Sequence, residues 1–372
     1  MRSRTPRRGR TLAALAAAAA VVAGPALSAP AASAAPRAAA LVPAVDREIQ
    51  FTADGTTAYG TVHIPAHRSG RKLAAALLIP GSGPSDRNGD QPPALTPHTL
   101  SLLADALGQD GVMSLRFDKY GTGKTGLGGR HRAPDMAAYT RQAVAAYRTL
   151  RAQPEADPRA LLVVGHSEGG LQALLVDRAV PAKPAGLALL APQDLRLLDM
   201  LGFQLADGLD RQVAAGQLTP AQATLNKAGV ARAIADFRAG RPVDTSGLLP
   251  ALATLLGGVF GPVNADFVRS DDALYPPSVA RGVAPGTRTL VTCGTADTQV
   301  PCSTTPPLRA ALAAAGTTGP GLRVLPGIDH VLHPAGTPTN DPMLAPAARR
   351  ALHDFVRPWR PRPTGNTAGP AA

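Results

Sequence analysis

The chain has 372 residues, of which 45% are hydrophobic and only 3% aromatic. This length allows one large domain with an insertion or two small domains, and the core must be built mainly of Ala, Leu and Val. The formal net charge of +12 includes five arginines and no acidic residue within residues 1–34, so a mature chain would carry about +7. The remaining basic residues form no cluster interleaved with aromatics, which argues against a nucleic-acid partner and predicts a solvated basic surface.

The N-terminus has the organisation of an export signal. Residues 2–10 are basic, residues 12–23 are apolar, and Ala32-Ser33-Ala34 is an A-x-A cleavage site. We predict a signal peptide over residues 1–34 and a secreted protein. The break at Gly24-Pro25 makes the apolar stretch too short for a stable membrane span, a retained anchor being the alternative. Arg7-Arg8 is followed by Gly9-Arg10 rather than by an apolar pair, which leaves both the Sec and the Tat routes open.

Strand and helix patterns alternate after a lead-in at residues 35–47 that we predict to be disordered. An antiparallel pair is expected at residues 48–52 and 59–64, around the turn Asp54-Gly55. Parallel-type strands are predicted at residues 73–79, 112–117, 161–164 and 186–190, with helices at residues 99–107 and 135–150. This alternation indicates an α/β fold with a mostly parallel sheet.

The most informative motif is Gly165-His166-Ser167-Glu168-Gly169, which follows the apolar run of residues 161–164 and precedes a helix-like stretch at residues 171–179. A strand, the pattern G-x-S-x-G and a helix together are typical of a nucleophile elbow, a sharp turn that presents a serine. Small neighbours such as Gly165 and Gly169 let the chain pass close to itself in this turn. We therefore predict Ser167 as the nucleophile.

A helical insertion interrupts the alternation next. Residues 194–283 are rich in Leu and Ala and mostly helical in period up to about Ala239, with segments broken by Pro and Gly beyond it. The strand pattern returns at residues 288–293. We predict a core in two parts, residues 48–193 and 284–357, with a cap between them and a disordered Pro/Gly-rich tail at residues 358–372.

The residues that would activate Ser167 follow in the expected order, a carboxylate and then a histidine. Asp297 follows the strand predicted at residues 288–293, and His330 follows the strand predicted at residues 322–325. Both would lie at the carboxyl ends of parallel strands, where open α/β sheets place their ligands. We predict that His330 takes the proton of Ser167 and that Asp297 orients the imidazole.

Other residues compete for these roles. Asp297 could simply cap its turn, and His333 lies three positions beyond His330. We favour His330 because it comes first after the strand. Asp329 is too close in sequence to His330 to orient it, and His353 lies in a helix-like stretch, which favours a surface or packing role.

With these motifs the chain resembles the α/β-hydrolase superfamily, in particular the bacterial branch related to esterases, dienelactone hydrolases and serine aminopeptidases. Residues 80–84 (PGSGP) are similar to the oxyanion loop after the third strand, although Pro80 stands where many relatives carry histidine. Residues 114–123 are similar to the R-x-D-x-x-G-x-G turn after the fourth strand. The resemblance implies an eight-stranded, mostly parallel sheet with helices on both faces and a helical cap after strand 6. It also implies that the backbone N–H groups of Ser82 and Glu168 form the oxyanion hole.

The only two cysteines, Cys293 and Cys302, stand on either side of Asp297. Export to an oxidising compartment favours a disulfide between them, which would close the loop that carries the predicted acid. Two separately buried thiols are the alternative.

Neither a cofactor nor a metal is predicted. Residues 121–125 (GTGKT) end like a phosphate-binding loop, but Asp118 stands where that loop needs its first glycine. Residues 86–90 resemble the start of a calcium loop, yet their glycine comes one residue early and no glutamate follows, so we expect a polar rim beside the oxyanion loop. No His, Cys or carboxylate cluster in the sequence has zinc spacing.

Together these residues predict an exported serine hydrolase that cleaves a small-molecule carboxylic ester through an acyl-enzyme intermediate. The alternative is a serine aminopeptidase or amidase with the same triad. That activity would need a cap carboxylate to hold a substrate ammonium, for which the candidates are Asp207, Asp210, Asp266, Asp271 and Asp272. A non-catalytic binding protein of the same fold is disfavoured, because a binder has no need of a complete triad.

Overall fold

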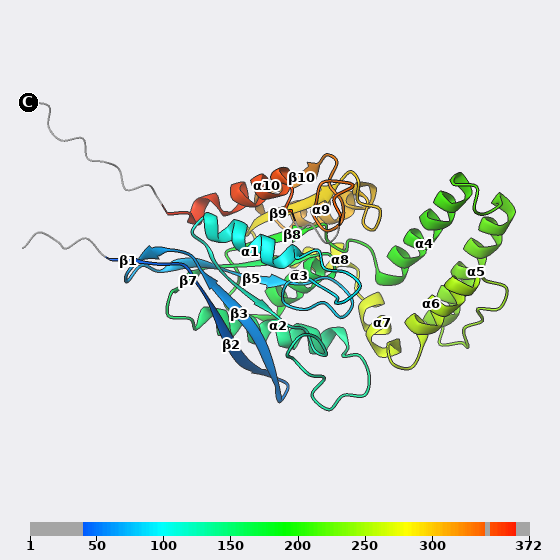
Figure 1. Cartoon of the computed structure of the whole chain (residues 1–372), viewed down its shortest axis with the longest axis horizontal. Coiled ribbons are helices and arrows are strands. Elements are labelled where there is room, and N and C mark those ends of the chain that lie inside the picture. Colours follow the sequence, from blue (N-terminus) through cyan, green and yellow to red (C-terminus); the bar gives the residue numbers. More distant parts are fainter. Residues whose placement is uncertain (1–39, 339–342, 362–372) are drawn as a thin grey trace, which may run out of the picture. The chain divides into compact units, whose positions relative to one another are not determined.

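The central sheet has eight strands in the order β10-β9-β8-β7-β5-β6-β3-β2 (Figure 1). The computed structural model describes residues 40–338 and 343–361, which belong to one compact unit. The strands are β2 Val45–Ala53, β3 Thr56–Ile64, β5 Leu73–Ile79, β6 Met113–Phe117, β7 Ala156–His166, β8 Gly186–Leu190, β9 Arg288–Gly294 and β10 Thr318–Leu325. The pairs β2–β3 and β3–β6 are antiparallel and all other neighbours are parallel, so the predicted eight-stranded, mostly parallel sheet is confirmed.

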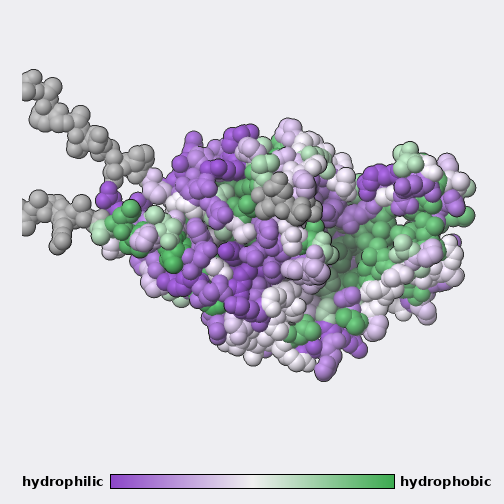
Figure 2. All heavy atoms as spheres, in the orientation of Figure 1, coloured by the Kyte–Doolittle hydropathy of each residue, from purple (hydrophilic) through white to green (hydrophobic). Residues whose placement is uncertain are grey.

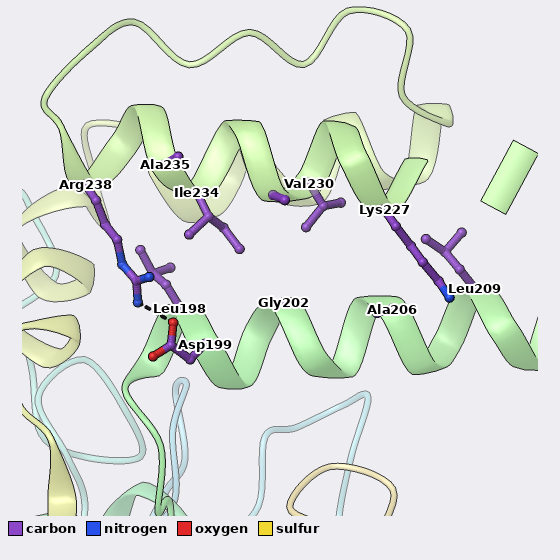
Figure 3. Close-up of a pocket in the computed structure, with 11 residues that line it drawn as sticks. Leu198, Asp199, Gly202, Ala206, Leu209, Lys227, Val230, Ile234, Ala235 and Arg238 are labelled. Carbon is purple, nitrogen blue, oxygen red and sulfur yellow. Dashed lines mark hydrogen bonds and ion pairs between the residues drawn. The ribbon is translucent and has the colours of Figure 1, made fainter. Parts of the chain in front are cut away.

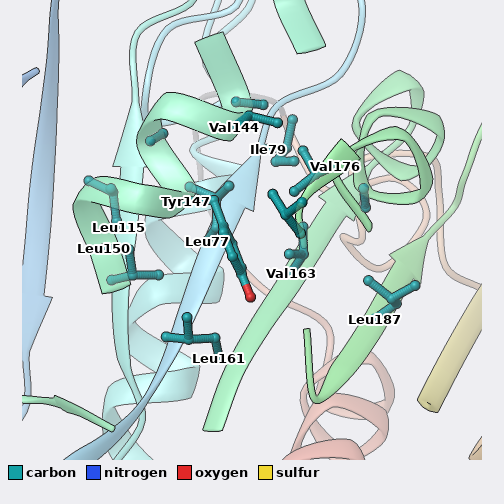
Figure 4. Packing of buried hydrophobic residues seen from close by; sticks show 14 of the residues in the cluster. Leu77, Ile79, Leu115, Val144, Tyr147, Leu150, Leu161, Val163, Val176 and Leu187 are labelled. Atoms are coloured by element: carbon teal, nitrogen blue, oxygen red, sulfur yellow. The ribbon is translucent and has the colours of Figure 1, made fainter. Parts of the chain in front are cut away.

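Helices cover both faces of this sheet because its central strands are apolar on both sides. All seven residues of β5 are buried, and alternate side chains of a strand point to opposite faces. Leu77 and Ile79 pack in a cluster with residues of α2 (Met136–Arg151), α3 (Glu168–Ala179) and α9 (Pro306–Ala314), part of which Figure 4 shows. Ala76 and Leu78 belong to the cluster of the opposite face, with residues of α1 (Thr99–Gln109) and α10 (Pro346–Val356).

The insertion between β8 and β9 consists of helices with a hydrophobic core of their own. They are α4 Leu197–Ala214, α5 Pro220–Arg238, α6 Pro250–Phe260, α7 Ala265–Asp272 and α8 Pro276–Ala280. The core of this cap includes Leu198, Ile234, Phe237, Leu256 and Val268. Within the described part of the chain no single helix is long and apolar enough to cross a membrane. Of the described helices, only α6 and α7 taken together reach that length and apolar composition, and they are bent by 83° at their junction.

The prediction that the helical part of the cap ends near Ala239 is wrong. Beyond Gly240 two of the prolines begin helices: Pro250 and Pro276 stand at the starts of α6 and α8. A proline fits there because the first N–H groups of a helix have no acceptor within it.

The predicted disordered ends are too long. β1 (Leu41–Val42) pairs with β4 (His67–Arg68), and β2 begins at Val45, opposite Ile64, so most of the described part of the predicted lead-in, residues 40–47, is strand. At the other end Arg357–Trp359 forms a 3-10 helix, and the Trp359 ring packs edge-on against Phe355 at 5.8 Å between centroids. The predicted signal peptide at residues 1–34 and the rest of the predicted tail, residues 362–372, lie outside the described residues.

Candidate active site

Ser167 occupies a strained turn between β7 and α3. Its φ of 56° and ψ of −124° lie outside the regions that a residue with a side chain ordinarily adopts. The turn depends on the two glycines that flank it, since a Cβ on Gly165 would overlap the Gly169 carbonyl and a Cβ on Gly169 would overlap the Ile79 carbonyl. The backbone therefore has the close approach that the sequence motif predicts, and Ser167 stands at the N-terminus of α3.

The structure brings the three predicted catalytic residues together from the ends of three strands. Ser167 Oγ lies 3.0 Å from His330 Nε2, and His330 Nδ1 lies 2.8 Å from Asp297 Oδ2. Ser167 follows β7, Asp297 follows β9 and His330 follows β10. Both His330 and Asp297 are buried, at 8% and 4% exposure, so water competes little for the bonds that they make. This geometry suits proton transfer from the hydroxyl to the imidazole.

Asp297 is held by its own loop. Its second oxygen, Oδ1, accepts hydrogen bonds from the backbone N–H groups of Gln299 and Val300, each at 2.8 Å. A disulfide between Cys293 and Cys302 closes the same loop, with a Cα–Cα distance of 5.2 Å. The carboxylate therefore has one oxygen fixed by the backbone and the other free to face His330.

The competing residues lie in other environments. His333 is fully buried, its Nε2 lies 3.1 Å from the Pro97 carbonyl, and its backbone N–H donates to Asp329. His353, on α10, pairs with Asp110 at the end of α1, 2.8 Å away. Among the described histidines, His330 is the one whose ring nitrogen lies within hydrogen-bond distance of Ser167 Oγ, where it can accept the hydroxyl proton.

The two predicted oxyanion donors flank Ser167. Glu168 is the first residue of α3, where backbone N–H groups have no acceptor within the helix and the helix dipole favours negative charge. Ser82 follows β5 on a loop that touches the nucleophile: a Cβ built on Gly81 would lie 3.1 Å from the Cβ of Ser167. Ser82 and Ser167 also line the same cavity. Both N–H groups therefore belong to residues next to Ser167, where an oxyanion would form on a substrate bound to it.

Two titratable residues of this site escaped sequence reasoning. His166 Nε2 lies 2.8 Å from the backbone carbonyl of His330, and burial, with the nearby His330 as a smaller cause, lowers the pKa of His166 to about 4. Asp194, fully buried beside the acid loop, accepts a hydrogen bond from Thr304 Oγ1 at 3.0 Å, and burial raises its pKa to about 6. The sequence gives only weak signals for these two residues. His166 occupies a variable position of G-x-S-x-G, and Asp194 follows a predicted strand, as Asp297 does.

A cavity of about 400 Å³ between the core and the cap opens onto Ser167. Its cap side is mainly apolar, with Leu197, Met200, Leu201, Val259, Phe267 and Val268 in its lining. Figure 2 shows hydrophobic residues gathered over the cap helices where the surface is hollowed. Among the described residues, no charged side chain lines this cavity. A smaller cavity of about 70 Å³ also reaches Ser167 and is lined by His166 and His330.

The cap carboxylates that could hold a substrate ammonium are engaged elsewhere. Asp207 pairs with Arg211, Asp210 with Lys227, Asp266 with Arg132 and Asp272 with Arg238. Asp271 is fully buried and accepts a hydrogen bond from Gln193 at 2.7 Å. Burial, and to a lesser extent the charge of Glu168, raises the pKa of Asp271 to about 8.

A separate cavity of about 510 Å³ lies within the cap, between α4 and α5 (Figure 3). Asp199 and Arg238 form an ion pair of 2.7 Å at one end of it, beside Leu198. Lys227 lies at the other end, and the aliphatic side chains of Ile234 and Val230 lie between. Its lining shares no residue with the lining of the cavity at Ser167.

Fold and site together define an α/β-hydrolase. The family model described as serine aminopeptidase, S33, matches residues 98–202, which include the elbow. No match is found among curated proteins. The chain has the α/β-hydrolase fold, and over residues 98–202 it is similar to this hydrolase family, as its resemblance to the α/β-hydrolase superfamily predicted.

Solved structures share this fold at low sequence identity. The Pyrococcus furiosus esterase Pf2001 is similar with a TM-score of 0.54 and 15% identity, over 85% of this chain and 91% of that chain. Est1E from Butyrivibrio proteoclasticus, with ferulic acid bound, has a TM-score of 0.52 and 14% identity, over 84% of this chain and 98% of its own. The α/β-hydrolase GrgF from Penicillium sp. sh18 has a TM-score of 0.53 and 16% identity, over 85% of this chain and 99% of its own. At these identities the likeness concerns the fold.

Proposed function

We propose that this protein is a secreted serine hydrolase that cleaves carboxylic esters whose apolar part fills the cavity beneath the cap. The observation that carries the proposal is the position of Ser167: hydrogen-bonded to His330 on one side, and open to a cavity without charged lining residues on the other, as far as the chain is described. An ester carries no charge at the reacting group, so such a cavity can bury its hydrocarbon part without leaving a charge unpaired.

The reaction then follows from the positions of the groups. Ser167 attacks the acyl carbon while His330 takes its proton, and Asp297 stabilises the imidazolium that forms. The backbone N–H groups of Ser82 and Glu168 stabilise the negative charge on the former carbonyl oxygen. His330 returns the proton to the departing alcohol, and water, activated by the same histidine, cleaves the acyl-enzyme.

The competing activity is that of an aminopeptidase, which the description of the matching family model brings forward. Such an enzyme must bind a substrate ammonium, and an ammonium buried without a carboxylate is strongly disfavoured. Each of the five candidate cap carboxylates has a protein partner, and none is among the lining residues of the cavity at Ser167. This favours an ester over an aminoacyl amide.

A graded series of p-nitrophenyl esters, compared with aminoacyl p-nitroanilides, tests the choice. We expect turnover of the esters, with kcat/KM rising as the acyl chain lengthens enough to fill the cavity. Turnover of the anilides alone would reverse the assignment.

Export is part of the same proposal. It is supported by the composition of residues 1–34 and by the disulfide between the only two cysteines, since disulfides persist in oxidising compartments. Sequencing of the N-terminus of the protein recovered from the culture medium should find cleavage after Ala34. Retention of an intact N-terminus in the cell would contradict it.

A further inference from the structure

Lys119 reaches the oxyanion loop from a separate turn of the chain. Its side chain is buried, at 4% exposure for the residue, and its Nζ donates a hydrogen bond of 2.8 Å to the backbone carbonyl of Gly81. The same ammonium lies 3.4 Å from Glu168 Oε1 and 4.9 Å from the centre of the Tyr139 ring. One cation thus contacts both segments that carry the predicted oxyanion donors.

The contact with Gly81 fixes the direction of one of these donors. The Gly81 carbonyl and the Ser82 N–H belong to the same peptide group, which is planar and, because the only cis bond among the described residues is Pro92-Pro93, trans. In a trans peptide the C=O and the N–H point in opposite directions. A cation that holds the carbonyl therefore holds the N–H facing the other way, and it also polarises the group so that the N–H becomes a stronger donor.

The contact with Glu168 reaches the second donor. Glu168 is the first residue of α3, and its backbone N–H is the group next to Ser167. Lys119 is the only side chain that donates to this carboxylate within the described part of the chain, and Glu168 Oε2 is buried without a partner. The ammonium therefore ties the start of α3 to the oxyanion loop.

The backbone around Lys119 is rigidly held. Asp118 accepts hydrogen bonds from Arg87 Nε at 3.0 Å and Nη2 at 2.8 Å, and from the backbone N–H of Lys124 at 2.8 Å. Gln142 accepts from the backbone N–H of Tyr120 and donates to the Asp118 carbonyl. A side chain that starts from so constrained a segment is suited to orient a peptide group in advance of the reaction.

We propose that Lys119 is a positioning residue of the oxyanion hole, which orients and polarises the Gly81–Ser82 peptide through the Gly81 carbonyl. This rests on the proposed function of Ser82 and Glu168. A buried ion pair alone would explain the contact with Glu168, but not the shorter hydrogen bond to Gly81. Buried ion pairs are also weak contributors to stability, so a purely structural role gives little reason for the charge.

The test is Lys119→Met, which keeps an unbranched side chain one atom shorter and removes the charge. We expect kcat for a p-nitrophenyl ester to fall about 10- to 100-fold, while KM stays within about twofold. This fall is at most that caused by removing a whole oxyanion donor. The inhibition constant of a trifluoromethyl ketone, whose adduct with serine places an oxyanion in the hole, should rise by the same factor. A structural role would not raise this constant in step with the fall in kcat.

Two further variants separate the explanations. Lys119→Met with Glu168→Gln removes the carboxylate that the single variant leaves buried and unpaired, and it should fold while remaining slow. Lys183→Met is the matched control, because Lys183 Nζ also donates to a backbone carbonyl, that of Asp177, 2.5 Å away near the other end of α3. Its kcat should not change.

Three results would overturn the proposal: a folded Lys119→Met with unchanged kcat and inhibition constant, a rise in KM alone, or full recovery of kcat in the double variant. Failure of the proposed esterase activity is a different result, in which the wild-type protein hydrolyses no ester. In that case the rate of Ser167 labelling by an organophosphonate, which also places an oxygen in the hole, gives the comparison between wild type and Lys119→Met.

Discussion

His166 contacts His330 through both its ring and a hydrogen bond. The His166 Nε2 donates a hydrogen bond of 2.8 Å to the His330 backbone carbonyl, and the two ring centroids lie 5.0 Å apart. A carbonyl only accepts, so the proton of this bond sits on Nε2, and the lowered pKa of His166 keeps the ring neutral. The residue before the nucleophile thus supports the residue proposed to activate it. The same buried ring makes the fold sensitive to acid.

His166→Gln should remove part of this acid sensitivity. Between about pH 6.5 and pH 4 the unfolded chain binds a proton at His166 that the folded protein excludes, so stability falls as the pH falls through this range. The contribution is about 3 kcal/mol in the free energy of unfolding. Gln keeps an N–H for the His330 carbonyl but does not titrate. Urea unfolding at pH 7 and pH 4 should therefore show a smaller loss in the variant, and equal losses would contradict the prediction.

The base is tested by a pair of histidine variants. His330→Ala should abolish ester turnover as completely as Ser167→Ala, and Ser167→Ala should also abolish labelling by an organophosphonate, with both variants folded. His333→Ala is the control: it removes a buried ring whose Nε2 lies 3.1 Å from the Pro97 carbonyl, so it should lower the melting temperature and leave most of kcat. Loss of turnover in His333→Ala with activity retained in His330→Ala would show that the base is misassigned.

The acid is tested against its buried neighbour. Asp297→Asn should lower kcat about 10³- to 10⁴-fold, because an amide facing Nδ1 favours the tautomer that cannot accept the serine proton. Asp194→Asn is the matched change, since Asp194 is equally buried but bonds to Thr304 and not to His330. It should lower kcat less than tenfold. A larger fall in kcat for Asp194→Asn than for Asp297→Asn, measured with the same ester, would identify Asp194 as the acid that orients the histidine.

Much of the fold was predictable from local pattern. The predicted strands at residues 73–79 and 186–190 coincide with β5 and β8, because continuous apolar runs bounded by turns are typical of strands buried on both faces. The first part of β7, residues 156–160, was missed. It contains Asp157, Pro158 and Arg159, which interrupt the apolar pattern, and Ala156 is strand because it pairs with Leu73 of the neighbouring strand.

The residues of the candidate site were predictable only where they occupy a defined position of a known sequence motif. Ser167, Asp297 and His330 each follow a predicted strand in a known order, and the structure brings them within hydrogen-bond distance. Lys119 lies inside a motif as well, yet nothing in its spacing shows that it contacts Gly81, 38 positions earlier in the chain. Contacts of this kind depend on which turns the sheet places side by side, and a single sequence carries no direct signal of that.

Asp271→Asn should change how stability depends on pH. Because the pKa of Asp271 is raised to about 8, the folded protein holds a proton there that the unfolded chain releases above about pH 4. Stability from this group therefore falls as the pH rises from about 4 to 8. Asn keeps an acceptor for Gln193 and removes the titration. The melting temperature of the variant should exceed that of wild type increasingly from pH 5 to pH 8, whereas Asp266→Asn, at an exposed ion pair with Arg132, should show no such trend.

Reduction of the disulfide should loosen the loop that presents Asp297. The bond between Cys293 and Cys302 closes a loop of about ten residues, and its loss should lower the free energy of unfolding by about 2–3 kcal/mol on a chain-entropy estimate. Asp297 lies inside this loop, with Oδ1 bonded to the N–H groups of Gln299 and Val300, so a looser loop presents the carboxylate to His330 less accurately. Mild reduction, or the double variant Cys293→Ala with Cys302→Ser, should therefore lower kcat. Because Gln299 and Val300 of the same loop line the cavity at Ser167, KM should rise as well. Thiol titration of the denatured, unreduced protein should find no free thiol. Two free thiols, or a reduced protein with unchanged melting temperature and kcat, would contradict this role of the bond.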